Sequence, residues 1–432
     1  MLVLFRMMNP VQAEEYPYTD EQTPEITSTN AYLIDVDNGQ VIWSFSGETE
    51  LYPASMTKVM TAVIALEELP DPQERIPITD MMWTGLIEAD ASVAGFWPGD
   101  SPTVLELLYG TLLPSGADAV NALAYRISGS IDAFVERMNQ KAAEIGMEHT
   151  HFTNPTGLHN NGHYSTARDI SILMRYALQN ELFTDIISHR TYTTGPLASA
   201  PDGLTLTSTC WPVINNGEGT IPITGFLGGK TGYTPEAGRC LVSHARQDDM
   251  HMVLVTAGSR DLGHIQDAGT IYNWYFERYR RQTLLEEGTV LKEVQVLDAW
   301  KNPVFTLTAP SQCTMDLPAD AVVETILDVP DTLQAPVLAG DAIGTLKLTA
   351  DGQTVYEETV YAPESYRYSS LMHLGNQLHR FRKNHPVLFW FPAVFLTLLF
   401  FYLILLVRYH IRRALRRRRR RRRRQAQRKT RI

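Results

Sequence analysis

Cysteine is scarce in this sequence of 432 residues, and its scarcity excludes two classes of site. The three cysteines, at positions 210, 240 and 313, are too few and too scattered for a disulfide scaffold. No C-x-x-C pair occurs, so the sequence contains no signature of a zinc ribbon or a thiol redox site. We expect buried free thiols. The apolar content of 44 % argues against a chain that is disordered throughout, and the length suggests two or three domains.

Acidic residues are missing from the C-terminal end. Residues 408–432 contain fifteen of the 38 Arg and Lys residues and no acid, which leaves 23 bases and 48 acids in the first 407 residues. The net charge of −10 is therefore the sum of a body at −25 and a tail at +15. Residues 386–407, directly before the tail, carry no charge over 22 residues, which is long enough for a transmembrane helix.

The positive-inside rule predicts that the tail is cytoplasmic and that everything before residue 386 lies outside the membrane. Beside a spanning helix, the Arg-rich tail indicates contact with anionic membrane lipids rather than with nucleic acid. An outside body requires an export signal, and residues 1–24 are interpreted as an atypical signal peptide and leader. They lack a basic start, but Val11-Gln12-Ala13 resembles a small-residue cleavage site.

The exported body has the pattern of an α+β domain over residues 25–285, with a sheet and many helices. Apolar and polar residues alternate over 31–46 around Asp37-Asn38-Gly39, which predicts a hairpin. Paired strands are expected near its end, over 240–243 and 252–256. Helical spacing predicts helices over 56–69, 103–113, 115–128, 131–145, 166–178 (with Ser165 as N-cap) and 265–280.

The residue pattern of the sequence changes after residue 287. Short alternating segments separated by Gly, Pro, Asp and Asn predict a small antiparallel β-sandwich or barrel over residues 288–362. Residues 363–385 form a polar, basic linker with a possible amphipathic helix. The expected order is therefore an α+β domain, a small all-β domain, a linker, a transmembrane helix (386–407) and a cytoplasmic tail (408–432).

The first motif with chemical content is Ser55-Met56-Thr57-Lys58, which places a hydroxyl and an amine three residues apart at the start of a helix. Residues i and i+3 share a helix face, so Lys58 can reach the Ser55 hydroxyl. A serine is activated only when a base removes its proton, and an ordinary lysine pKa of about 10.4 is too high for that role. Burial and a second cation would lower it. Alone, the motif also fits a capping serine beside a solvated lysine.

Two further motifs follow at domain-scale spacing. Ser115-Gly116-Ala117-Asp118 lies between two apolar helices, and Gly229-Lys230-Thr231-Gly232-Tyr233 leads into a strand. Each alone fits an ordinary turn. S-x-x-K, then a serine-containing motif, then K-T-G is the order that penicilloyl-serine transferases share.

With these motifs the sequence resembles the D-alanyl-D-alanine carboxypeptidases, the low-molecular-mass penicillin-binding proteins of the serine type. The resemblance covers roughly residues 25–362. It implies a β-lactamase-like fold, a cell-wall role outside a bacterial membrane, peptidoglycan stem peptides as substrates and β-lactam antibiotics as acylating ligands. The segments that carry it are PASMTKVMTA (53–62), LLPSGADAVNALA (112–124), FTNPTGLHNNGHYSTARDI (152–170) and GGKTGYTPEAGRCLVS (228–243).

The resemblance also implies roles for individual residues. Ser55 would be the acylated nucleophile, Lys58 its general base and Ser115 a proton relay. Lys230 would supply a positive field and Thr231 would bind the substrate's terminal carboxylate. The Gly232–Tyr233 segment would lie against the substrate, with the backbone N–H groups of residues 55 and 233 forming the oxyanion hole. No metal or other cofactor is expected.

Two positions depart from the family pattern. The family's second motif reads S-x-N, whereas this sequence has Ala117 at the Asn position, and Asn121 lies one turn further along. The family also often places an Arg near the strand after K-T-G that contacts the substrate carboxylate. Arg260 and His264 both lie in that region, and the sequence does not choose between them. The alternatives to a DD-carboxypeptidase are a catalytically silent penicillin-binding or cell-wall sensor protein, and a β-lactamase or DD-endopeptidase. No convincing E-x-x-x-N element of the commonest β-lactamases is present.

Overall fold

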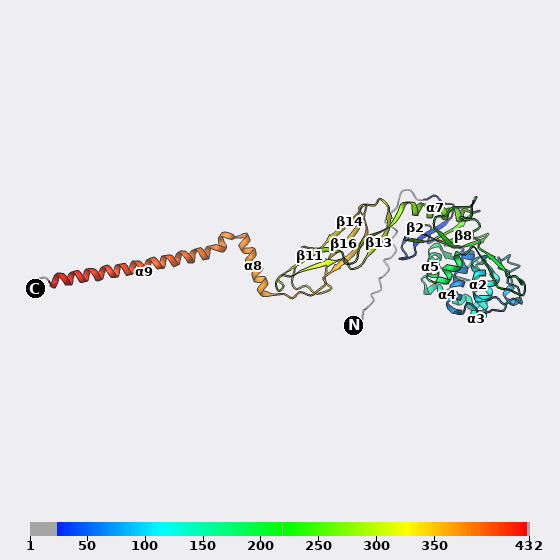
Figure 1. Ribbon diagram of the computed structural model, residues 1–432, viewed down its shortest axis with the longest axis horizontal. Coiled ribbons are helices and arrows are strands. Elements are labelled where there is room, and N and C mark those ends of the chain that lie inside the picture. Colours follow the sequence, from blue (N-terminus) through cyan, green and yellow to red (C-terminus); the bar gives the residue numbers. More distant parts are fainter. Residues whose placement is uncertain (1–23, 218, 430–432) are drawn as a thin grey trace. The chain divides into compact units, whose positions relative to one another are not determined.

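A computed structural model describes residues 24–217 and 219–429 (Figure 1). The signal peptide expected over residues 1–24 lies outside the described residues, apart from Pro24. The chain divides into two compact units. The first extends to Thr283 and also includes Thr314–Val322, and the second contains Leu284–Cys313 and the chain from Val323 onward. The first unit is therefore discontinuous in sequence.

The first unit is built on a five-stranded antiparallel sheet in the order β2-β1-β9-β8-β7. The predicted hairpin is confirmed: Gly39 has a φ of +76° in the turn that joins β1 to β2. The predicted pairing of the two late strands is also confirmed, in β8 and β9. The strands are β1 (Asn30–Asp35), β2 (Val41–Phe45), β7 (Phe226–Thr234), β8 (Gly238–Gln247) and β9 (Met250–Ser259).

Both faces of this sheet are buried, because alternate side chains of a strand point to opposite faces. On β1, Tyr32 and Ile34 pack into the larger core with six helices, whereas Ala31 and Leu33 pack into a second core with the single helix α7 (Figure 1). The six helices are α1 (Lys58–Glu68), α2 (Val104–Leu112), α3 (Ala117–Ser128), α4 (Ile131–Glu144), α5 (Ala167–Ala177) and α6 (Glu181–Ser188); α7 is Gly263–Arg278.

The predicted helices are present, with differences at their ends. A 3-10 turn, η1 (Ala54–Thr57), precedes α1, so Ser55 lies on this turn and Lys58 is the first residue of the α-helix. The predicted N-cap of α5 is wrong. Thr166, not Ser165, accepts the capping hydrogen bond from the backbone N–H of Asp169. Ser165 belongs to a short strand instead, where its backbone pairs with β3. The helix α6 was not predicted.

A two-stranded ribbon of β10 (Tyr279–Leu285) and β13 (Cys313–Pro318) closes the first unit. Arg281 on β10 forms ion pairs with Asp35 and, at 2.8 Å from its Nε, with Asp316 on β13. Tyr275 donates its hydroxyl proton to Asp316 at 2.9 Å. Both carboxylates are buried, and Arg281 supplies their countercharge. The remaining short elements are β3 (Glu50–Leu51), β4 (Ser165–Thr166), β5 (Thr191–Thr193), β6 (Thr205–Thr207) and η2 (Asp80–Trp83).

The second unit contains the predicted all-β domain, made of two three-stranded sheets around one apolar core that includes Val294, Val296 and Phe305. The expectation of a wholly antiparallel domain is wrong for one pair, because β15 runs parallel to β11. The sheets are β12 (Val304–Thr308), β11 (Val290–Leu297) and β15 (Thr332–Gln334), and β14 (Val323–Asp328), β16 (Ala342–Ala350) and β17 (Gln353–Tyr361).

Two helices end the second unit. Most of the expected linker forms α8 (Ser370–Asn384), which is held to the all-β domain: His373 and Asn376 lie 2.9 and 2.8 Å from the two carboxylate oxygens of Asp298. The last helix is α9 (Pro386–Lys429). Among the described residues, it is the one helix with a segment, Pro386–Arg420, that is long and apolar enough to cross a membrane. Its most apolar stretch of 18 residues has a mean hydropathy of 2.5 and is not buried against protein.

Candidate active site

The first motif brings its serine and lysine into contact. The Lys58 Nζ atom donates a hydrogen bond to the Ser55 Oγ atom at 2.9 Å and another to the Thr156 carbonyl oxygen at 2.6 Å. The spacing of three residues thus places both groups on one side of the turn, as expected. Lys58 is almost completely buried, and no carboxylate of the described residues forms an ion pair with it.

This environment disfavours the charged form of Lys58. Burial lowers the pKa of Lys58 well below its ordinary value, and the positive charge of Lys230 lowers it further, against a smaller opposing effect of the Asp118 carboxylate. Lys230 is therefore the second cation that was expected to lower the pKa of Lys58. A lysine whose neutral form is favoured in this way can accept the proton of Ser55.

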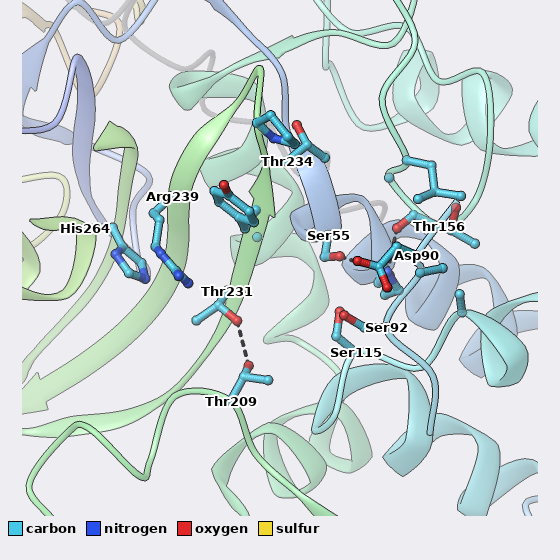
Figure 2. Close-up of a pocket in the computed structure, with 18 of the residues that line it drawn as sticks. Ser55, Asp90, Ser92, Ser115, Thr156, Thr209, Thr231, Thr234, Arg239 and His264 are labelled. Carbon is cyan, nitrogen blue, oxygen red and sulfur yellow. Dashed lines mark hydrogen bonds between the residues drawn. The ribbon is translucent and has the colours of Figure 1, made fainter. Parts of the chain in front are cut away.

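The second motif places a buried hydroxyl in the same pocket. Ser115 has a φ of +69°, and its Oγ atom has no hydrogen-bond partner among the described residues. Figure 2 shows the Ser115 side chain directed toward the pocket that also receives Ser55. A buried hydroxyl without a partner is costly, which is typical of a group whose partner is a substrate or a reacting atom.

Asp118, the last residue of this motif, holds the loop that forms one wall of the pocket. Its carboxylate accepts hydrogen bonds from three successive backbone N–H groups at 2.7–2.9 Å, those of residues 94, 95 and 96. Burial raises the pKa of Asp118, while these hydrogen bonds act in the opposite direction. This role is not evident from the sequence, because the bonded loop lies more than twenty residues away in the chain.

Ala117 leaves the family's Asn position without an amide side chain. It lines the pocket, and its backbone N–H donates to the Ser92 carbonyl oxygen at 2.8 Å. Asn121 does not take over this position, because its side-chain amide donates to the Met82 carbonyl oxygen at 2.8 Å and does not line the pocket.

The third motif lies on β7, at the edge of the sheet beside η1. Lys230 is completely buried, and burial lowers its pKa to about 8. Its Nζ atom donates to the carbonyl oxygen of Thr231 at 2.9 Å, and the Thr231 hydroxyl lies 2.6 Å from that of Thr209. Tyr233 is exposed at the rim of the pocket.

These motifs line one pocket of about 680 Å³ within the first unit (Figure 2). Ser55, Lys58, Ser115, Thr231, Gly232 and Tyr233 are among its lining residues; Lys230 is not, and its side chain is completely buried. Of the two candidates after the strand, His264 lines the pocket and Arg260 does not. Residues that sequence reasoning missed complete the walls: 89–92, 156–158, Thr209, Val213, Arg239 and Leu262.

His163, one of four histidines between residues 149 and 163, has contacts within the protein core. His163 is buried: its Nε2 lies 2.8 Å from the Thr57 hydroxyl, and its Nδ1 accepts from the Thr153 N–H at 3.0 Å. Burial lowers the pKa of His163 to about 4, so the ring is neutral at pH 7. Within the ranges that the structure describes, no three His, Cys, Asp or Glu side chains converge as metal ligands would.

Comparison with known proteins gives matches to both units of the chain. A family model described as D-alanyl-D-alanine carboxypeptidase matches residues 18–261, and a second, described as the C-terminal domain of penicillin-binding protein 5, matches residues 279–367. The D-alanyl-D-alanine carboxypeptidase DacF of Bacillus subtilis is 32 % identical over 352 residues, which cover 78 % of this chain and 85 % of DacF.

Solved structures give the same result. The chain is similar to penicillin-binding protein 5 from Haemophilus influenzae, with a TM-score of 0.64, 25 % identity and coverage of 81 % of this chain and all of the other. It is also similar to the DD-transpeptidase of Streptomyces K15, with a TM-score of 0.54, 28 % identity and coverage of 59 % and 99 %. The first family model alone matches more than half of the chain. The protein therefore belongs to the D-alanyl-D-alanine carboxypeptidase family of serine peptidases.

Proposed function

We propose that this enzyme removes the terminal D-Ala from peptidoglycan stem pentapeptides through an acyl-enzyme on Ser55, and that penicillins acylate the same residue. The observation that carries the proposal is the contact of 2.9 Å between Lys58 and Ser55, in a pocket where Lys58 is buried beside a second cation. A lysine in this setting is a suitable general base for a serine nucleophile.

In the proposed mechanism, neutral Lys58 takes the Ser55 proton as the Oγ atom attacks the carbonyl carbon of the penultimate D-Ala. The developing oxyanion lies between the backbone N–H groups of Ser55 and Tyr233, each worth about 3 kcal/mol in comparable sites. Collapse of the tetrahedral intermediate breaks the peptide bond, and the proton reaches the leaving amine through the Ser115 hydroxyl. A water molecule then hydrolyses the ester, with the proton path reversed, and restores Ser55.

Lys230 and Thr231 act on substrate charge in this proposal. The positive charge of Lys230 favours the oxyanion and keeps Lys58 neutral, while the Thr231 hydroxyl contacts the terminal carboxylate. Thr231 supports this role because it faces the pocket beside Thr209 (Figure 2). The domain order supports a site outside a bacterial membrane, with α9 as the anchor and the Arg-rich tail in the cytoplasm against anionic lipids.

The test is labelling with a fluorescent penicillin together with a D-Ala release assay on a stem pentapeptide. We expect the wild type to be labelled and to release D-Ala, and Ser55→Ala to do neither. Labelling of Ser55→Ala would overturn the assignment of the nucleophile. Labelling of the wild type without release of D-Ala would favour the silent sensor, and rapid loss of the bound label would favour a β-lactamase.

A further inference from the structure

A buried histidine that the proposed mechanism does not use joins two segments of the active site. The Nδ1 atom of His163 accepts a hydrogen bond from the backbone N–H of Thr153 at 3.0 Å, so the proton of the neutral ring is on Nε2. Nε2 therefore donates to the Thr57 hydroxyl, which lies 2.8 Å away. One ring thus links the turn η1 to the loop of residues 153–158.

This loop is held as one piece and lies directly on η1. The Asn154 Oδ1 atom accepts hydrogen bonds from the backbone N–H groups of residues 156, 157 and 158 at 2.7–3.2 Å. Gly157 has a φ of +82°, and a Cβ atom at this position would overlap the carbonyl oxygen of Ala54 on η1. A shift at the start of the loop, where His163 bonds it, is therefore passed on to its later residues.

The same loop provides the second contact of the Lys58 amine. The Thr156 carbonyl oxygen accepts a hydrogen bond from the Nζ atom at 2.6 Å, and the Ser55 Oγ atom lies 2.9 Å from Nζ. A neutral amine has two N–H groups and one lone pair, whereas a carbonyl oxygen can only accept. The Thr156 carbonyl therefore takes an N–H group and leaves the lone pair for the Ser55 proton. All three residues line the pocket, and Figure 2 labels Ser55 and Thr156.

We propose that His163 is a positioning residue, which fixes the Thr156 carbonyl and thereby the direction of the Lys58 amine. This inference rests on the proposed function, in which Lys58 is the general base for Ser55. Proton transfer to a general base requires hydrogen-bond geometry, and a misplacement of about 1 Å can cost about 100-fold in rate. A histidine that does not touch the substrate can therefore control the rate through the loop.

The His163 ring keeps the same hydrogen bonds over the pH range of the assay. Burial lowers its pKa to about 4, and the positive charges of His151, His159 and Lys58 act in the same direction. Above about pH 5 the ring is therefore neutral, and Nδ1 remains an acceptor for the N–H of Thr153. A change in the acid limb of the rate above this pH then reports on Lys58 rather than on His163.

The experiment measures the rate of acylation by a fluorescent penicillin on the full chain in detergent micelles. We expect His163→Ala to reduce this rate by about 100-fold. Thr57→Val keeps the histidine and the packing but removes the acceptor of Nε2, and it should reduce the rate by about tenfold. Thr57→Ser restores a hydroxyl and should recover most of the rate. His149→Ala is the matched control, because the side chain of His149 is exposed.

The dependence of the acylation rate on pH separates positioning from a loss of stability. A loop that is no longer fixed admits water to Lys58, which raises the pKa of this lysine toward its ordinary value. Because Lys58 must be neutral to act, the acid limb should move to higher pH in His163→Ala and in Thr57→Val. Thermal unfolding shows whether each variant is folded, and Thr57→Val decides if His163→Ala is not.

Three outcomes would overturn the inference. One is a wild-type acylation rate in Thr57→Val, and another is an equal loss in the His149→Ala control. The third is a slower rate with the acid limb in its wild-type place, which means that His163 only stabilises the fold. Failure of the proposed function looks different: the wild type is then not labelled, or Ser55→Ala is labelled, whatever stands at position 163.

Discussion

The backbone of Gly232 lies directly against the amide nitrogen of Ser55. A Cβ atom at position 232 would be 3.0 Å from that nitrogen and 3.1 Å from the carbonyl oxygen of Pro53. The glycine of K-T-G therefore allows β7 to approach the turn that carries Ser55, the proposed nucleophile. Both neighbouring atoms are backbone atoms, so they cannot move aside as a flexible side chain would.

We expect Gly232→Ala to slow acylation of Ser55 by at least about tenfold, since a displacement of a few tenths of an ångström misaligns the groups that react. The melting temperature should change much less than the rate. The measurement is the rate of labelling by fluorescent penicillin. Gly375→Ala is the control, because a Cβ atom at this exposed position in α8 meets nothing within 4 Å. A wild-type rate in Gly232→Ala would contradict the role given to this contact.

The two buried lysines predict a bell-shaped dependence of kcat/KM on pH. Lys58 must be neutral to act as a base. Because its pKa is lowered well below its ordinary value, protonation of Lys58 should reduce the rate only on the acid side of the profile. Lys230 must be charged, and its pKa of about 8 means that its charge is lost as the pH rises through that value. The alkaline limb should therefore begin near pH 8.

The profile is measured with the pentapeptide from pH 5 to pH 10, with a check that the enzyme remains folded at each value. A rate that stays constant from pH 7 to pH 10 would show that Lys230 keeps its charge, or that its charge is not needed. A rate that rises through pH 10 would show that Lys58 has an ordinary lysine pKa.

We expect Asp118 to stabilise the pocket wall, although it is not one of the residues proposed to react. Replacement by Ala removes the acceptor of three backbone N–H groups, and we expect a loss of about 3 kcal/mol in the free energy of unfolding. Chemical denaturation measures it. Asp132→Ala, an exposed first-turn acid of α4, is the control and should cost about 0.5 kcal/mol. Equal effects of the two replacements would contradict the anchoring role.

Ala117 can be converted to the residue that the family carries. We expect Ala117→Asn to raise the acylation rate about tenfold, because an added amide can hydrogen-bond the substrate in the space that Ala117 lines. Asn121→Ala should leave the rate unchanged and lower the free energy of unfolding by about 1 kcal/mol, since its amide bonds Met82. If Asn121→Ala slows acylation and Ala117→Asn does not affect it, the two positions have been assigned wrongly.

Membrane attachment should depend on α9 and orientation on the tail. A chain that ends at residue 385 should appear in the soluble fraction, whereas the full chain should stay with the membrane after a wash in 1 M salt, because apolar burial is not screened. Replacement of the nine arginines from 416 to 424 by Gln should preserve attachment, but part of the protein should then insert in the opposite orientation. Protease access from each side of the membrane measures this. Release of the full chain by salt would contradict a spanning helix.

The sequence predicts those parts of this structure that depend on short-range patterns. The Asp37-Asn38-Gly39 turn and the spacing of Ser55 and Lys58 are local, and both were predicted correctly. The order of the three motifs predicted one common site, because penicilloyl-serine transferases share that order. The contacts of Asp118 with residues 94–96 join segments more than twenty residues apart, so no local period reveals them. The cap of α5 was misplaced because Ser165 and Thr166 have similar capping preferences and tertiary pairing decided between them.

The ribbon of β10 and β13 limits how this protein can be divided. A fragment ending at residue 285, where the sequence suggests a domain boundary, would lack β13 and therefore Asp316, a partner of both Arg281 and Tyr275. The catalytic unit is thus not released by a single break in the chain. Exchanging the all-β unit between relatives therefore requires three junctions, after Thr283, Cys313 and Val322.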